Sequence, residues 1–154
     1  MPHQIFVFLV ETDRVNGSLQ KQPFKFENAS VTKMILRRDG ETVMSESQAT
    51  NFAAAELNAK EAYFYACQSL DVGHNSRDAD LTYGQYCNNS TFWAWTLSPD
   101  MDGNSGVCMI QKPGNFELDI YVAPGTANPA LTALVVGKFG STVRIAEDNT
   151  TTLI

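Results

Sequence analysis

The sequence predicts a mainly β protein, an antiparallel β-sandwich of about seven to eight strands with a helical insertion near residues 50–71. Apolar and polar residues alternate most clearly over Asn115–Val122, as expected for a strand that places one face on a core and the other in water. Glycine, proline, asparagine and aspartate separate the extended runs, and one alanine-rich segment interrupts them. Among sandwiches and barrels, a jelly roll is the leading candidate.

The first third of the chain contains two predicted strands and a hairpin. Gln4–Glu11 is almost continuously apolar, which favours a central strand buried on both faces. A turn over 13–21 and an extended segment at 23–26 lead into Val31–Arg38, which has strand-like composition and spacing. The following Asp39-Gly40 is a strong hairpin signal, with residues 41–44 as the returning arm.

The predicted helical insertion begins where the composition changes after Ser47. Alanine and aromatic residues are frequent from Thr50 to Leu70, and glycine and proline are absent there. Thr50 or Asn51 is the expected N-cap, because both side chains can accept a hydrogen bond from the first helical turn. We expect one or two helical segments that end before Gly73.

The second half of the chain contains the remaining predicted strands. In addition to Asn115–Val122, these strands are Thr91–Leu97, Val107–Ile110, Leu131–Phe139 and Thr142–Ile145. We expect Leu131–Phe139 to pair with Asn115–Val122 across the loop that holds Pro124 and Gly125. Trp93 and Trp95 share one face of their strand, an arrangement that usually indicates packing but can also line a ligand groove.

Composition limits the number of domains, the partners and the location of this protein. A length of 154 residues fits one domain spanning 1–154. The net charge of −6 argues against nucleic acid as a partner, so Lys33, Arg37 and Arg38 are interpreted as ordinary strand and turn charges. Residues 1–10 are too short to span a membrane and lack the features of a signal peptide, so we expect no membrane partner and an intracellular location.

No catalytic, cofactor-binding or metal-binding residue is predicted, so the chain is not expected to be an enzyme. His3 and His74 are far apart in the sequence and are expected to be solvent-exposed. The odd number of cysteines favours free thiols, and no base is evident for Cys87 or Cys108 as a nucleophile. The segment 100–106 resembles the start of a calcium loop but has Ser105 where an EF-hand has glycine, so a plain turn is expected.

Several motifs together resemble the major capsid proteins of Polinton/Maverick elements and the related adintoviruses. The segment 22–28, QPFKFEN, followed by an alternating strand and Asp39-Gly40, resembles the "NPFxF…LDG" region of that family. The segment 92–100, FWAWTLSPD, is similar to its "FAFDLTPD" strand. The segment 112–120, KPGNFELDI, is similar to its "KxGNLRLELKF" segment, and the closing strands follow in the same order.

The resemblance implies a non-enzymatic structural protein, a viral capsid or capsid-derived jelly roll that self-associates into oligomers. Family members have two tandem jelly rolls, whereas this sequence is similar only to the later part of the second one, without its first strand. We therefore expect a homo-oligomer in which a strand of another chain can complete the sandwich in trans, located in the virion if the chain is viral. The alternative is a lectin-like jelly-roll module in which Trp93 or Trp95 stacks on a ligand.

Overall fold

The computed structural model describes residues 2–43, 48–52, 58–70, 81–98, 114–125 and 127–140, and the backbone of two short strands at 143–145 and 151–153. The predicted strand at 107–110, the loop at 73–80 and the calcium-like turn at 100–106 lie outside the described residues. His74 and Cys108 also lie outside them.

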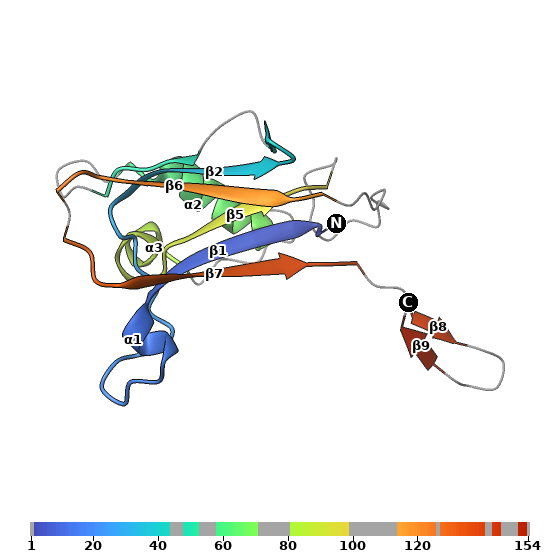
Figure 1. Ribbon diagram of the computed structural model, residues 1–154, viewed down its shortest axis with the longest axis horizontal. Coiled ribbons are helices and arrows are strands. Elements are labelled where there is room, and N and C mark those ends of the chain that lie inside the picture. The colour runs from blue at the N-terminus through green and yellow to red at the C-terminus, as the bar shows by residue number, and fades with distance from the viewer. Residues whose placement is uncertain are drawn as a thin grey trace.

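The described strands form two antiparallel sheets and a separate hairpin (Figure 1). The first sheet has the order β5-β1-β7, with β5 at Phe92–Thr96, β1 at Gln4–Glu11 and β7 at Leu131–Lys138. In the second sheet β2 (Val31–Arg38) pairs on one side with β6 (Phe116–Val122) and on the other with the two-residue strands β3 (Glu41–Thr42) and β4 (Gln48–Ala49). The hairpin β8–β9, Val143–Ile145 with Thr151–Leu153, lies beyond the end of β7. The predicted fold class, a mainly β antiparallel sandwich, is confirmed.

The core lies between the inner faces of the two sheets. Ile5, Val7 and Leu9 of β1 are buried together with Met34 and Leu36 of β2. These residues occur at every second position within β1 and within the central part of β2, as expected when side chains alternate between the faces of a strand. The same inner face of the first sheet carries both tryptophans, since β1 pairs Ile5 with Trp95 and Val7 with Trp93.

The hairpin after β2 forms as the sequence predicts. Asp39 and Gly40 both have positive φ angles, 50° and 85°, which is the backbone of a type I′ turn. Arg38 is paired with Glu41 across the turn.

The prediction that residues 131–139 pair with residues 115–122 is wrong. β7 pairs with β1 in the first sheet, whereas β6 pairs with β2 in the second sheet. The connection 123–130 carries the chain from one sheet to the other, and it is long enough to do so because stacked sheets lie only about 10 Å apart. Leu118 lies opposite Leu36 in the second sheet, and Val135 lies opposite Val7 in the first.

The helical insertion is present but begins later than expected. Helix α2 spans Lys60–Ser69, with Ala59 rather than Thr50 or Asn51 at its N-cap. The Thr50 hydroxyl instead donates a hydrogen bond to the carbonyl of Val31, next to β4. Asn51 forms an isolated antiparallel bridge with Asn58, so the chain is still extended where the helix was expected to start.

Two shorter helices are not anticipated by the sequence analysis. Helix α1, Thr12–Val15, occupies part of the expected turn after β1. Helix α3, Tyr83–Asn89, begins with a capping box in which Thr82 and Gln85 bind each other's backbone N–H groups. This Thr-x-x-Gln spacing is a recognised helix-start signal, so α3 could have been found in the sequence.

Tyr86 on α3 is a buried group whose ionisation should couple to stability. Its hydroxyl donates to the carbonyl of Phe92 at 2.7 Å, and burial raises its pKa well above the ordinary value. Unfolded tyrosine ionises near pH 10, so the folded state binds more protons above that pH. The free energy of unfolding is therefore expected to be insensitive to Tyr86 below about pH 10 and to fall as pH rises above it.

Tyr86→Phe is expected to cost about 1–2 kcal/mol at pH 7, because the Phe92 carbonyl loses its buried donor. The substitution should also make the alkaline loss of stability shallower. Urea unfolding of both proteins between pH 7 and 11 measures this difference. Some slope should persist, because burial also raises the pKa of Tyr83 and a hydrogen bond with Cys67 raises that of Tyr63. Parallel curves for the two proteins would contradict the assignment to Tyr86.

Candidate functional site

Among the described residues, those considered in the sequence analysis for chemistry do not assemble into a reactive site. His3 is half-buried rather than exposed, and a side chain at Gly140 would contact its imidazole. Cys87 is buried and Cys67 half-buried, both as free thiols. Burial raises the pKa of the Cys87 thiol, which disfavours the nucleophilic thiolate. Within the described residues, no group of three or more His, Cys, Asp or Glu side chains could hold a metal ion.

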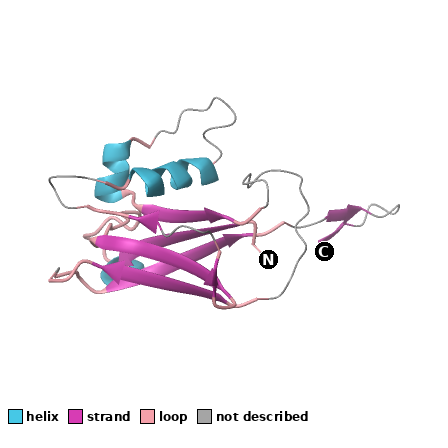
Figure 2. Ribbon diagram, turned by 90° about the horizontal axis from the view of Figure 1, so that it is seen from above, coloured by secondary structure: helices cyan, strands magenta, loops and turns pink. Residues whose placement is uncertain are grey.

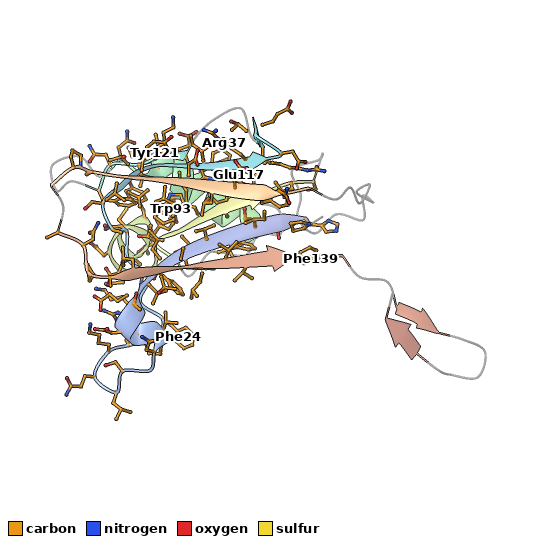
Figure 3. All side chains as sticks on the ribbon, viewed as in Figure 1. Phe24, Arg37, Trp93, Glu117, Tyr121 and Phe139 are labelled. Carbon is orange, nitrogen blue, oxygen red and sulfur yellow. The ribbon has the colours of Figure 1, made fainter. Side chains whose placement is uncertain are left out.

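The two tryptophans are enclosed in the core. Trp93 has an exposed fraction of 0 % and Trp95 of 1 %, and Figure 3 shows Trp93 within the body of the sandwich. The ring of Phe52 packs edge-on against Trp93, with centroids 6.5 Å apart. Neither indole is therefore available to stack on a ligand arriving from solvent.

Basic side chains on the second sheet have local partners. Arg37 forms a 2.9 Å ion pair with Asp119, and Arg38 lies 3.6 Å from the carboxylate of Asp39. The Lys33 ammonium lies 5.8 Å from the centre of the Tyr121 ring, and Figure 3 shows Arg37, Glu117 and Tyr121 on this part of the molecule. The three basic residues are strand and turn charges, as the sequence analysis predicts. No helix among the described segments is long and apolar enough to cross a bilayer.

A cluster of charged side chains ties the segment after β1 to that strand. The Lys21 ammonium donates to Glu11 at 2.7 Å and to Asp13 at 3.2 Å, and Arg14 lies 3.2 Å from Glu11. The hydrogen bond from Lys21 lowers the pKa of Glu11, and the same bond raises the pKa of Lys21. These charges neutralise one another, so the cluster stabilises the local backbone.

One side of the sandwich is covered by a helix. Helix α2 packs against β5 and β4, which are the edge strands of the two sheets on that side. Figure 2 shows α2 lying along one side of the strands. Ala62 and Ala66 on its inner face are completely buried and belong to the core.

The opposite side of the sandwich, bordered by β6 and β7, is open. We define the open side by the inner-facing residues of these two edge strands: Leu118, Ile120 and Val122 of β6, and Ala133 and Val135 of β7. Their cross-strand neighbours on β2 and β1 are buried, but Val135 is 60 % exposed and Val122 is 43 % exposed. Leu118 and Ile120 are only partly buried. These side chains point toward the core yet remain in contact with solvent, because no described strand lies beside them.

The backbone of β7 presents unused hydrogen-bonding groups to the open side. The Thr12 N–H donates to the Ala130 carbonyl at 2.9 Å, and hydrogen-bonded pairs alternate along an antiparallel ladder. The peptide groups of Leu134 and Val136 therefore face β1, whereas those of Ala133 and Val135 face outward. An edge strand with outward-facing peptide groups can pair with a further strand.

The open side could not be identified from the sequence, because it depends on which strands are neighbours. The sequence does contain one hint, since residues 131–137 include no charged residue and no proline, although natural edge strands are usually protected by such residues. No protein-family model, curated protein or solved structure matches this chain.

Proposed function

We propose that this chain is a non-enzymatic structural protein, a viral capsid or capsid-derived jelly roll, that self-associates through the open side of its sandwich. The observation that carries the proposal is the pair of free edges, β6 and β7, with apolar side chains that point inward but remain exposed. Uncovered strand edges and contiguous exposed apolar side chains are typical of interaction surfaces. A protein that functions by assembly requires such a surface and no reactive side chains.

The strand connectivity supports a jelly roll. Along the sequence, the paired strands β2 and β4 both lie between the paired strands β1 and β5. This is the order of strands in one long hairpin that is folded over into two sheets. The later strands β6 and β7 then return beside β2 and β1, as in Greek-key connections. If this order of strand pairs continued outward, one more strand would lie beside β6 and one more beside β7. The described residues supply neither of these two strands.

The sequence resemblance supports the capsid assignment. The motifs similar to the Polinton/Maverick and adintovirus proteins include β5 and β6 and the segment before β2. In this proposal the protein forms part of the wall of a protein shell, and its location is the virion or an assembly derived from one. The acidic balance of the chain, −6 overall, suits a shell wall better than a genome-binding surface.

The lectin-like alternative has lost its main support. It depended on Trp93 or Trp95 stacking on a ligand, and both indoles are buried. No other described feature favours it.

Self-association is tested by size-exclusion chromatography with light scattering on the purified chain, together with negative-stain electron microscopy. The expected result is a discrete oligomer whose mass is a multiple of 17.0 kDa, seen in the microscope as particles of uniform size. A stable monomer at a concentration of about 100 μM would contradict the proposal, since it would imply a dissociation constant of about 1 mM or weaker, a free energy of association of only about −4 kcal/mol.

A further inference from the structure

We propose that β7 pairs with β7 of a second copy of this chain, antiparallel and about a two-fold axis at Val135, which joins the two three-stranded sheets into one continuous sheet. This inference rests on the proposed self-association and specifies its contact. It assigns the symmetry, the register and the strand, none of which the proposed function requires.

The backbone and side chains of β7 favour one residue for the axis. Two antiparallel copies of one strand place a single residue opposite itself, in either a hydrogen-bonded or a non-hydrogen-bonded pair. Ala133 and Val135 direct their peptide groups outward, as the ladder with β1 shows, so an axis at either of them lies at a hydrogen-bonded pair. Val135 is nearer than Ala133 to the middle of the strand, Leu131–Lys138. Its side chain is also more exposed, at 60 %, than those of Leu134 and Val136, at 38 % and 51 %, where the axis would lie at a non-hydrogen-bonded pair.

The side chains of β7 are compatible with this register. An axis at Val135 places the two Val135 side chains together and Ala133 opposite Gly137 on the inner face. On the outer face it places Leu134 opposite Val136, which are 38 % and 51 % exposed in the single chain. No pair of like charges is created, because Lys138 comes to lie opposite Thr132. Apolar and β-branched cross-strand pairs stabilise antiparallel sheets.

The edge of β6 is less suitable for self-pairing. Its outer face carries two carboxylates, Glu117 and Asp119. Asp39 donates its backbone N–H to Asn115 at 3.0 Å, so the alternating ladder directs the peptide groups of Leu118 and Ile120 outward. A two-fold axis at Leu118 would set Glu117 opposite Asp119 twice, and like charges placed directly opposite are destabilising. An axis at Ile120 avoids this charge pair, but either axis pairs only five residues of β6 (116–120 or 118–122), against the seven of β7 (132–138) that an axis at Val135 pairs. The uncharged edge is therefore the one that a second copy fits.

A matched pair of lysine substitutions tests the contact. Val135→Lys places two ammonium groups together on the axis and should weaken the dimer by about 100-fold or more. Phe64→Lys is the control, because Phe64 is 62 % exposed, close to the 60 % of Val135, but lies on α2 at the covered side of the sandwich. Sedimentation equilibrium should show dimers for the unsubstituted chain and for F64K, and monomers for V135K. Circular dichroism of V135K should match that of the unsubstituted chain.

Cysteine pairing tests the register without relying on charge. Leu134→Cys and Val136→Cys are made separately in chains that also carry Cys67→Ser and Cys108→Ser; Cys87 is retained because it is completely buried. A Leu134–Val136 pair is a non-hydrogen-bonded pair with Cα atoms about 4.5 Å apart, within the range of a disulfide. Oxidation of the mixture should give the mixed disulfide dimer in high yield. Each variant alone should give little, because its cysteines are two positions out of register.

The outcomes separate this inference from the proposed function. A trimer, or an oligomer that V135K leaves intact, overturns the β7 pairing but leaves self-association standing. Disulfide yields that are equal in the mixture and in the single variants also overturn the pairing. A chain that remains monomeric removes both proposals. Loss of the oligomer in V135K but not in F64K, together with the mixed disulfide, establishes the pairing.

Discussion

Trp93→Ala is expected to lower the free energy of unfolding by about 3–5 kcal/mol, the range for truncating a large buried aromatic side chain to alanine. Trp93 is completely buried, lies opposite Val7 in the first sheet, and contacts Phe52 from the other side. Its removal leaves a cavity between the sheets that neighbours held in two ladders cannot easily fill. Because single domains are stable by only about 5–15 kcal/mol, this loss is large. Urea unfolding followed by circular dichroism measures it as a lower midpoint with an unchanged slope.

Trp93→Phe separates the volume of the indole from its polar group. The Trp93 Nε1–H is buried and has no hydrogen-bond partner, so phenylalanine removes an unsatisfied donor while it retains most of the ring volume. We expect this substitution to cost clearly less than the alanine change, about 1–2 kcal/mol. Equal losses for the two variants would show that the nitrogen, rather than the ring volume, stabilises the core.

The strands themselves were accessible to sequence reasoning because their signals are local. Alternation or continuous apolarity located β1, β2, β5, β6 and β7 to within about two residues, and Asp39-Gly40 located the hairpin. The start of α2 at Lys60 was missed because Thr50 is a good N-cap in isolation, yet its hydroxyl is used by the Val31 carbonyl. That bond depends on a contact across nineteen sequence positions, which no local pattern can reveal.

Strand pairing, and with it the candidate site, was the part that sequence could not provide. β6 and β7 are consecutive in the described order and have compatible lengths, so a hairpin was the natural expectation. Both strands have apolar inner faces, and nothing in an alternating pattern states which sheet a strand will join. The exposure of Val135 follows from that choice: a residue of the same type within a central strand would be buried. The sequence therefore predicted the two strands that border the open side and their apolar faces, but not which sheet each strand joins.

Ala66→Asp is expected to lower the free energy of unfolding by at least about 3 kcal/mol, because an ionised carboxylate would replace a methyl group in an apolar contact. Ala66 is completely buried where α2 covers the edge strands β5 and β4. The reporter is again the urea midpoint. Phe64→Asp introduces the same charge two positions earlier, on the opposite and exposed face of the same helix, and should change stability by no more than about 0.5 kcal/mol.

The same pair of variants tests the proposal that the sandwich associates on one side only. If α2 detaches in A66D, the edge of β5 is exposed in addition to those of β6 and β7. A chain with unpaired edge strands on both sides can add further copies to form an open assembly. A two-fold contact through one edge strand instead forms a closed dimer. Light scattering should therefore show larger, polydisperse assemblies for A66D and none for F64D. Similar scattering from both variants would mean that α2 does not protect the covered side, and the difference between the two sides of the sandwich would then need another cause.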